Sequence, residues 1–444
     1  MNIILLSGGS GKRLWPLSND VRSKQFIKLL RNEEGQYESM VQRVYRQIMA
    51  VDDTSKVTIA TNKAQASAIK NQLGDAVSIC VEPCRRDTFP AILLSVSYLH
   101  DVLGVGKDEG VVVCPVDPYV DNSYYETVQY MGRLVEERKS NLFLMGIQPE
   151  GPSEKYGYII PSDDSKISAV KEFKEKPDVE TAKRYLTQNA LWNGGVFAFR
   201  LGYLLDIAHS MVEFKDYYDL YEKYETLTKI SFDYAVVEKE SNIRVVRYSG
   251  SWKDVGTWST MSEVMPDATK GKVLADNTCE RTHVINELEI PIICMGCKDM
   301  VIIAGEDGIL VSDRERSDAM KTYVEKLDNE EAMFAEKSWG TYRVIDAQKE
   351  TKTVHLSIAE GRSMSYHSYE ARDITWTILS GSGKVIIDGN EKAAKQGDVF
   401  SIQSGSKHMI TAYEDLEIIE VQFCKRRDAD KKRKYETVNI VINT

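Results

Sequence analysis

Positive charge is in short supply in this sequence. Its 57 Lys and Arg residues are outnumbered by 67 Asp and Glu residues, which gives a formal net charge of −10. Nucleic acids are bound by cationic surfaces that release phosphate counterions, so this balance excludes a general affinity for DNA or RNA. It does not exclude one small anionic ligand held by a local group of Lys and Arg side chains.

Long apolar runs are also lacking. No stretch reaches the roughly 18 residues that cross a membrane, and the opening run Ile3–Leu6 is too short for the core of a signal peptide. We therefore expect no membrane association and a cytoplasmic location, where the seven scattered cysteines would stay reduced. Cys294 and Cys297 have the spacing of half a zinc site, but no second Cys or His pair accompanies them, so ordinary thiols are the better interpretation.

The length of 444 residues predicts two or three domains, and 42% hydrophobic with 28% charged residues is a globular composition. Over residues 1–265, short apolar runs alternate with helix-length amphipathic segments. This predicts an α/β domain with a Rossmann-like sheet, mixed but mostly parallel, and helices on both faces. Ligands of such sheets bind at the carboxyl ends of the strands. The predicted strands are Ile3–Leu6, Lys56–Ala60, Val77–Val81, Gly110–Val113 and Asn141–Gly146. The predicted helices are Glu38–Met49, Ala64–Leu73, Thr88–Leu103 and Ser123–Glu137.

The rest of the chain is mostly short strand-like runs. For residues 266–328 they predict a small β-rich connector, like a β-helix, with a helix at Asp318–Leu327. We interpret Asn329–Lys337 as a linker, residues 337–424 as a β barrel or sandwich, and residues 425–444 as a solvated charged tail. The connector runs are Lys272–Val284, Ile290–Met295, Met300–Ala304 and Gly308–Val311. The barrel runs are Thr353–Ile358, Thr375–Leu379, Gly383–Ile387, Val399–Ile402, His408–Ala412 and Leu416–Val421.

A glycine loop follows the first predicted strand. Bare backbone N–H groups in such a loop can approach a phosphate closely. A Walker A loop would need Gly at position 6 and Ser or Thr at position 13, where the chain has Leu6 and Arg13. A dinucleotide-binding loop would need Gly at position 14, which is Leu14. The loop therefore indicates another class of nucleotide site, and its candidate residues are Ser7, Gly8, Gly9, Gly11, Lys12 and Arg13.

Further motifs occur along the chain in a characteristic order. The sequence resembles the long bacterial mannose-1-phosphate guanylyltransferases, which end in a cupin domain like that of mannose-6-phosphate isomerases. The resemblance covers nearly the whole chain, so chance similarity is a poor explanation. The segments that carry it are Leu6–Ser18, Ser23–Phe26, Cys84–Ile92, Pro115–Asp117, Gly146–Pro149, Tyr156–Ile159, Phe173–Pro177, Trp192–Phe197, Ser231–Val236, Trp252–Trp258 and Lys337–Tyr342.

The resemblance implies transfer of GMP from GTP to mannose 1-phosphate, giving GDP-mannose for polysaccharide biosynthesis and pyrophosphate. The attacking phosphate oxygen is already anionic, so the reaction needs charge neutralisation and in-line positioning rather than a strong base. The resemblance assigns Arg13 and Lys24 to the β- and γ-phosphates, and Asp117 and Asp254 to Mg²⁺, which prefers hard oxygen ligands. Without the resemblance, a turn or helix cap would be the better interpretation of either carboxylate.

The same resemblance implies a sugar site. Lys176 would bind the sugar phosphate, while Glu175 and Asn193 would bind sugar hydroxyls. In a regular strand Glu175 and Lys176 point to opposite faces, so a turn or bulge is needed to bring both to one pocket. The remaining sugar candidates are Tyr156, Gly157 and Asp233.

The base site is less defined by sequence. Arg86, Asp87 or the backbone of the Glu82–Thr88 loop would meet guanine. Asp87 replaces an Asn of the family, Pro118 stands where many members have His, and Glu154-Lys155 replaces a common Thr-Gly. The same chemistry on another sugar 1-phosphate or nucleoside triphosphate is therefore also open.

The cupin region contains His355, His367 and His408, three of the six histidines. An active isomerase of this type binds a divalent metal through Gln, His, Glu and His. The first three of those positions are here His367, Tyr369 and Ile374, and His408 is retained. An apolar side chain cannot bind a metal, so we interpret the barrel as a degenerate cupin. Its expected role is packing, regulation or the formation of a homodimer or higher homo-oligomer, and the oligomer is expected by analogy only. A bifunctional isomerase and a non-catalytic sugar-nucleotide sensor are competing hypotheses for the chain as a whole.

Overall fold

The computed structural model describes residues 1–444 apart from residues 10, 11, 20, 328–331 and 425–444. The described residues pack as two compact units. The first contains Met1–Leu14, Ser23–Ala268 and Arg314–Asp318; the second contains Trp15–Arg22, Thr269–Asp313 and the residues from Ala319 onward. The predicted domain boundaries near residues 265, 328 and 337 stay predictions. Among the described residues, no helix is both long and apolar enough to cross a membrane.

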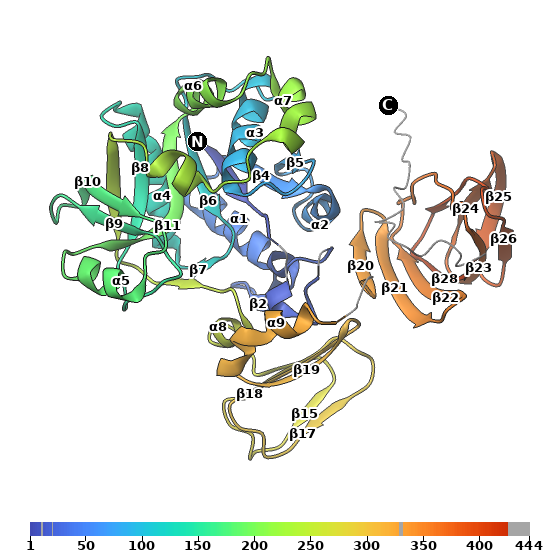
Figure 1. The fold of residues 1–444 in the computed structure, drawn as a ribbon. Helices are drawn as coiled ribbons and strands as arrows, with labels where there is room; N and C mark the ends of the chain where they lie inside the picture. Colours follow the sequence, from blue (N-terminus) through green and yellow to red (C-terminus); the bar gives the residue numbers. More distant parts are fainter. Residues whose placement is uncertain (10–11, 20, 328–331, 425–444) are drawn as a thin grey trace. The chain divides into compact units, whose positions relative to one another are not determined.

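A nine-stranded sheet lies at the centre of the first unit (Figure 1). In spatial order it contains β5 (Ser78–Glu82), β4 (Lys56–Asn62), β1 (Asn2–Leu6), β6 (Gly110–Pro115), β11 (Leu191–Arg200), β8 (Leu142–Ile147), β12 (Ile243–Tyr248), β10 (Ile167–Lys174) and β9 (Tyr158–Pro161). The strands from β5 to β6 are parallel, as are β8 and β12, whereas β11 runs antiparallel to β6 and β8, and β10 antiparallel to β12 and β9. The predicted Rossmann-like mixed sheet is confirmed.

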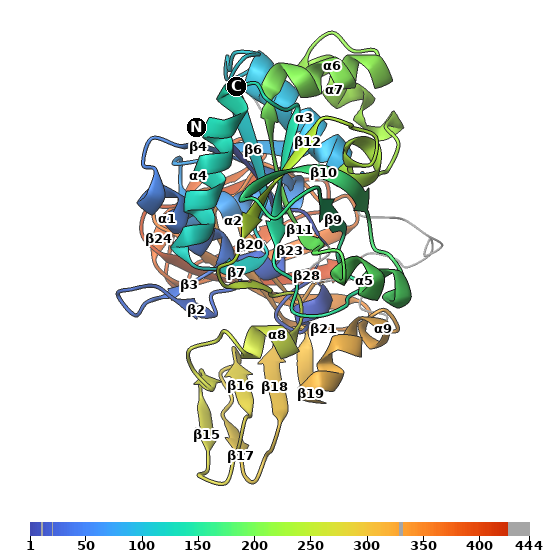
Figure 2. The ribbon, with the colours of Figure 1, turned by 90° about the vertical axis from the view of Figure 1, so that its left-hand side faces the viewer.

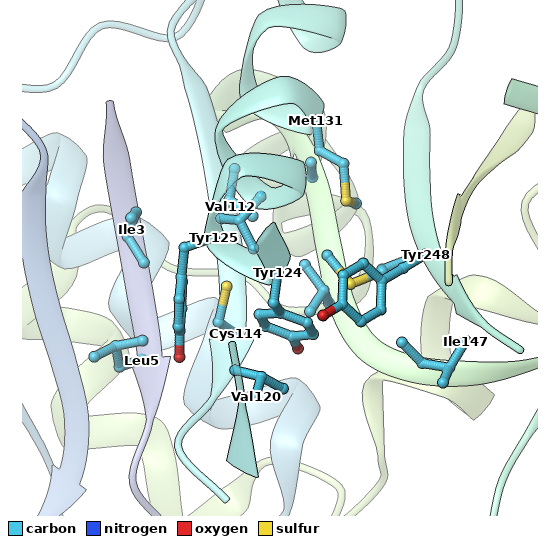
Figure 3. Close-up of a cluster of buried hydrophobic side chains, with 14 of the residues drawn as sticks. Ile3, Leu5, Val112, Cys114, Val120, Tyr124, Tyr125, Met131, Ile147 and Tyr248 are labelled. Carbon is cyan, nitrogen blue, oxygen red and sulfur yellow. The ribbon is translucent and has the colours of Figure 1, made fainter. Parts of the chain in front are cut away.

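Both faces of the sheet carry a hydrophobic core, and buried residues of the central strands alternate between the two cores. In β1, Ile3 and Leu5 belong to one core and Ile4 to the other. Figure 3 shows part of the first core, where Tyr124 and Tyr125 lie among side chains of the strands. The first core includes residues of α1 (Met40–Val51), α2 (Lys63–Leu73), α4 (Asn122–Glu136) and α5 (Val179–Leu186). The second includes residues of α3 (Thr88–Asp101), α6 (Leu201–Met211) and α7 (Tyr217–Lys223).

Short elements complete the first unit. A two-stranded ribbon pairs β7 (Pro118–Val120) with β13 (Trp252–Asp254), and a second pairs β2 (Leu30–Arg31) with β3 (Tyr37–Glu38). The short helices are η1 (Lys12–Leu14), η2 (Lys24–Phe26), η3 (Tyr224–Thr226), the π-helix η4 (Asp233–Val237), α8 (Trp258–Ser262) and η5 (Glu315–Ala319), which ends in the second unit.

The connector is built from short stacked strands (Figure 2). One sheet contains β14 (Thr269–Lys270), β16 (His283–Asn286), β18 (Met300–Gly305) and β19 (Gly308–Asp313), and a second contains β15 (Val273–Ala275) and β17 (Ile292–Cys294). The single run predicted over Lys272–Val284 is wrong, because a turn after Ala275 divides it between β15 and β16. The helix predicted over Asp318–Leu327 is shorter, as α9 (Met320–Val324).

The C-terminal part of the second unit is a pair of antiparallel sheets. One contains β20 (Phe334–Lys337), β21 (Gly340–Ala347), β22 (Thr351–Ile358), β28 (Leu416–Cys424), β23 (Arg372–Ser380) and β26 (Val399–Ile402). The other contains β25 (Asn390–Lys395), β24 (Ser382–Ile387) and β27 (His408–Ala412). The predicted barrel strands are present. The linker interpretation is wrong for Phe334–Lys337, because this segment pairs with β21. The charged tail lies outside the described residues.

Candidate active site

Three loops leave the sheet at the carboxyl ends of its parallel strands. Leu6, the last residue of β1, lies opposite Pro115 of β6, so the glycine loop and Asp117 leave the sheet from neighbouring strands. β5 ends at Glu82 and leads into the loop before α3. The candidate residues for phosphate, metal and base therefore share one edge of the sheet, as expected for this class of fold.

The glycine loop begins at a fixed residue. Ser7 is fully buried, and its carbonyl and hydroxyl oxygens lie 3.2 and 3.0 Å from the side-chain amide of Gln25, which donates to them. Gly8 and Gly9 are exposed, and a Cβ at either would meet no atom within 4 Å. Gly9 also has a φ of +130°, which residues with a Cβ rarely adopt. Open space above bare backbone is what the close approach of an anion requires. Outside the described residues lie Gly11 and the side chain of Lys12.

Two cations and two carboxylates gather beside this loop. The ammonium nitrogen of Lys24 is 3.0 Å from a carboxylate oxygen of Asp117. Asp254 and Arg13 both border Gly256: a Cβ placed there would lie 3.4 Å from an oxygen of Asp254 and 3.7 Å from a guanidinium nitrogen of Arg13. The structure thus brings together the four residues that the sequence assigned to phosphates and metal.

The β7–β13 ribbon holds the two carboxylates near each other. Asp254 ends β13 and pairs with Pro118, the residue that follows Asp117. Burial raises the pKa of Asp254; Lys24 and Arg13 oppose this rise in pKa, and the negative charge of Asp117 adds to it. The charges of Asp117 and Asp254 repel each other, so the site is suited to a ligand that carries positive charge.

A left-handed residue creates the turn predicted at the candidate sugar site. Lys176 has a φ of +44°, just beyond the end of β10. The side chain of Glu175 is 6% exposed, and one of its oxygens accepts a 2.6 Å hydrogen bond from the ammonium group of Lys176. Burial lowers the pKa of Lys176, but the hydrogen bond and charge of Glu175 outweigh it, so this pKa is raised. The two side chains therefore meet, as the sequence prediction required.

The other sugar candidates surround Glu175. A Cβ on Gly157 would lie 2.5 Å from the second oxygen of Glu175 and 3.3 Å from the Cβ of Asn193. The side-chain amide of Asn193 donates a 2.7 Å hydrogen bond to Asp233, and its carbonyl oxygen accepts one from the amide of Gly195 at 3.1 Å. This orientation of the Asn193 amide is therefore fixed from both ends.

Asp233 is the most strongly perturbed carboxyl of this group. Burial and the neighbouring charge of Glu175 raise its pKa to about 7, although the hydrogen bond from Asn193 and the charge of Lys176 oppose the rise. At neutral pH the group is therefore divided between an acceptor-only carboxylate and a neutral acid that can also donate.

The sugar candidate Tyr156 belongs to a group of three aromatic rings. The ring of Tyr156 is 4.8 Å from that of Trp192 and 5.4 Å from that of Trp252. Burial and the nearby charge of Asp254 raise the pKa of Tyr156 to about 12, so its hydroxyl stays protonated. Sequence reasoning selected Tyr156 but gave no role to the two tryptophans. The available signal was their position directly before Asn193 and two residues before Asp254.

The base-loop candidates make contacts within the protein. Asp87 has a φ of +72°, and its carboxylate accepts from the amide of Thr88 at 2.8 Å, so it caps α3. Arg86 donates to the backbone carbonyl of Glu225. The roles of Arg86 and Asp87 toward guanine stay predictions.

Two neighbours of these candidates were missed. Arg85 donates to the carbonyl of Gly9 at 3.1 Å and so ties the base loop to the glycine loop. Glu82 is buried and accepts a 2.6 Å hydrogen bond from the hydroxyl of Tyr224. Burial raises the pKa of Glu82 to about 7, against the effects of Tyr224 and Arg85. The signal for Glu82 was an acidic residue at the end of an otherwise apolar strand.

In the C-terminal barrel, His367 and His408 are buried with ring centroids 4.4 Å apart. Their Nδ1 atoms face the carbonyl oxygens of Ser365 and Ser406 at 2.7 and 3.0 Å. Ile374 is 2% exposed and packs in the core of the barrel. Within the parts of the chain that the structure describes, no group of three or more His, Cys, Asp or Glu side chains is arranged to hold a metal ion.

Known proteins resemble this chain over most of its length. The 'Alginate biosynthesis protein AlgA' of Pseudomonas putida is 27% identical, over 98% of this chain and 95% of its own. A 'Mannose-1-phosphate guanylyltransferase' of Escherichia coli is 28% identical, over 94% of this chain and 95% of its own. A crystal structure described as that of a 'mannose-1-phosphate geranyltransferase' from Thermus thermophilus is 25% identical, with a TM-score of 0.60, and covers 74% of this chain and 98% of that one.

Two family models match in the predicted order. Residues 325–436 match the family described as 'Mannose-6-phosphate isomerase C-terminal'. Residues 2–271, more than half of the chain, match the family described as 'Nucleotidyl transferase'. The resemblance stated from the motifs is therefore confirmed, and the chain belongs to the nucleotidyl transferase family, with a C-terminal mannose-6-phosphate isomerase-like region.

Proposed function

We propose that this enzyme transfers GMP from GTP to mannose 1-phosphate and releases GDP-mannose and pyrophosphate. The observation that carries the proposal is the cluster of Arg13, Lys24, Asp117 and Asp254 at the carboxyl edge of the sheet, beside an open glycine loop. Family membership supports the nucleotidyl transfer, and the names of the relatives support the choice of guanine and mannose. GTP and a sugar phosphate are cytoplasmic metabolites, so we place the reaction in the cytoplasm.

The carboxylate pair fits Mg²⁺. Its donors are hard oxygens, and the raised pKa of Asp254, caused by burial and opposed by Lys24, marks a negative charge that a divalent cation would stabilise. Asp117 and Asp254 would hold the ion. When bound, it supplies positive charge that neutralises the phosphate oxygens.

The other residues divide the work of binding. Arg13 and Lys24 would hold the β- and γ-phosphates, because the Arg fork can contact two oxygens and the Lys supplies a point charge. Ser7, Gly8 and Gly9 would offer backbone contacts to the phosphates. Stabilisation of the negative charge that develops on the departing pyrophosphate is the main chemical task of this half of the site.

The sugar half would orient the nucleophile. Lys176 would bind the phosphate of the sugar and direct one of its oxygens in line with the bond to be broken. Glu175, Asn193 and Asp233 would bind hydroxyl groups, and the aromatic group beside them would exclude water. The bond between the α- and β-phosphates breaks as the sugar phosphate forms its bond to the α-phosphate, so the leaving group carries the electron pair away as pyrophosphate.

The test is pyrophosphate release with Mg²⁺ over a panel of four nucleoside triphosphates and several sugar 1-phosphates. We expect the highest kcat/KM for GTP with mannose 1-phosphate. Absence of turnover with every pair would contradict the enzymatic proposal, and a clear preference for another pair would replace the substrates named here. A parallel assay with mannose 6-phosphate tests isomerase activity, which we expect to be absent because Ile374 occupies a ligand position of the active isomerases.

A further inference from the structure

The loop between the two phosphate-binding cations is anchored in the second unit. Arg13 and Lys24 belong to the first unit, whereas Trp15–Arg22 packs with the second. The chain therefore leaves the first unit after Leu14 and returns to it at Ser23. We name Trp15–Arg22 the anchored loop; residue 20 lies outside the described residues.

The first half of the anchored loop packs on the β18–β19 hairpin, which has a glycine on each side of its turn. β18 ends at Gly305 and β19 begins at Gly308 (Figure 2). A Cβ at Gly305 would lie 2.8 Å from a side-chain carbon of Leu17, and one at Gly308 would lie 2.5 Å from the ring of Trp15. Real Cβ contacts are not so short, so the absence of both side chains is a condition for this packing.

The second half is held by polar contacts. The side-chain amide of Asn19 donates a 2.7 Å hydrogen bond to Asp307 at the tip of the same hairpin. The side-chain oxygen of Asn19 accepts from the backbone amide of Arg22 at 2.7 Å. The guanidinium group of Arg22 donates two hydrogen bonds to Glu287, at 2.5 and 3.1 Å. The Arg22 side chain is 13% exposed, and its guanidinium carbon lies 5.3 Å from the centre of the Phe334 ring.

A bidentate Arg–carboxylate pair fixes orientation as well as distance, and its shielding from water strengthens it. Arg22 is two residues before Lys24, and Trp15 is two residues after Arg13. Movement of either end of the anchored loop therefore displaces a phosphate-binding cation through no more than one intervening residue.

We propose that the Arg22–Glu287 pair positions Lys24 and Arg13 for the β- and γ-phosphates of GTP, so that Arg22 and Glu287 act as positioning residues of the transferase site. The inference rests on the phosphate-binding roles proposed above. It gives the connector a part in nucleotide binding without any direct contact to the nucleotide.

The experiment is titration calorimetry of the full chain with GTP and with GMP, each in the presence of Mg²⁺. Glu287→Gln keeps the size of the side chain and removes the charge. We expect it to weaken GTP binding about tenfold, the effect of one misplaced charged hydrogen bond, and to leave GMP binding unchanged, because GMP lacks the β- and γ-phosphates. Glu289→Gln is the matched control, since Glu289 pairs with Lys272 at the exposed surface and should change neither affinity.

A second pair of variants tests the anchored loop without changing the Arg22–Glu287 ion pair. Gly308→Ala should push Trp15 and weaken GTP binding selectively. Gly296→Ala also changes a left-handed glycine of the connector, but its Cβ would meet only Thr278, at 3.8 Å, so GTP binding should be kept. Equal affinities for GTP in Glu287→Gln, Gly308→Ala and the wild type would overturn the inference, as would an equal loss for GTP and GMP. A different result would contradict the proposed function alone: the wild type binds GTP but shows no turnover, while the variants lose affinity for GTP and not for GMP.

Discussion

Asp233 offers a test in which a loss of function should accompany a gain in stability. The pKa of Asp233 is raised from its ordinary 3.8 to about 7 by burial and by Glu175. The unfolded chain ionises this group near pH 4 and the folded chain near pH 7, so between these values the folded chain holds one extra proton. Stability is therefore highest at low pH and falls as pH rises through this window.

The magnitude follows from the two pKa values. Each pKa unit corresponds to about 1.4 kcal/mol, so the difference between 3.8 and about 7 sets an upper bound of about 4 kcal/mol on the stability lost by pH 8. Asp233 keeps partial contact with solvent, and we expect about half of that bound, ~2 kcal/mol. The substitution Asp233→Asn removes the ionisable group and keeps an oxygen that can accept from Asn193.

Thermal unfolding of Asp233→Asn and the wild type at pH 8 and pH 5 measures the effect. At pH 8 the midpoint of the variant should be higher by about 6 °C, as expected for ~2 kcal/mol in a domain of this size. At pH 5 the gain should shrink to less than half, because the wild type is protonated there. In the pyrophosphate assay the same variant should have a raised KM for mannose 1-phosphate, since an acceptor for its hydroxyls is altered.

Asp178 serves as the control of opposite sign. Hydrogen bonds from the amide and hydroxyl of Thr181 lower the pKa of Asp178, so its charge favours the folded state above about pH 4. Asp178→Asn should therefore give no gain in midpoint at pH 8. An equal gain for Asp233→Asn at pH 5 and pH 8 would refute the reasoning, because the effect would then be independent of the charge.

Three further sets of measurements test separate parts of the chain. Asp117→Asn and Asp254→Asn should each lower turnover at least about 100-fold in the pyrophosphate assay, because the charge that binds Mg²⁺ is lost; wild-type rates in both would exclude the metal assignment. Gly157→Ala should raise the KM for the sugar phosphate and leave that for GTP unchanged, because its Cβ would lie 2.5 Å from Glu175; an unchanged sugar KM in steady-state kinetics would argue against this pocket. NMR titration should give His408 a pKa of about 4, lowered by burial, with stability lost as pH falls below about 6.5; titration near pH 6.5 would contradict the buried placement.

Much of the fold was predictable because hydrophobic periodicity decides it. β1 and β6 are continuous apolar runs, since both faces of the sheet are covered, and their carboxyl ends locate the glycine loop and Asp117. β25 was not predicted because Asn390–Lys395 is polar on its exposed face and only Ala394 is buried. β20 was missed for a similar reason: its alternation is short, and the pairing with β21 that fixes it is not visible in local sequence.

The sequence motifs named candidate site residues but did not define their geometry. The motifs selected Glu175 and Lys176, but only the positive φ of Lys176 explains how the side chains of these two consecutive residues reach one another. Arg22 carried no signal beyond its charge, because its partner Glu287 is 265 residues away. Contacts of that separation depend on the assembled fold and leave no periodic trace.

The β7–β13 ribbon also sets the order in which the site can form. The last strand of the main sheet, β12, ends at Tyr248, whereas Asp254 reaches Asp117 only when β13 pairs with β7. A chain emerging from the ribosome can therefore contain every strand of the main sheet before Asp254 has been synthesised. The pair of Asp117 and Asp254, which we propose binds the metal, can form only after residues 252–254 are made. A product truncated just before them would have a nearly complete sheet and would lack this pair.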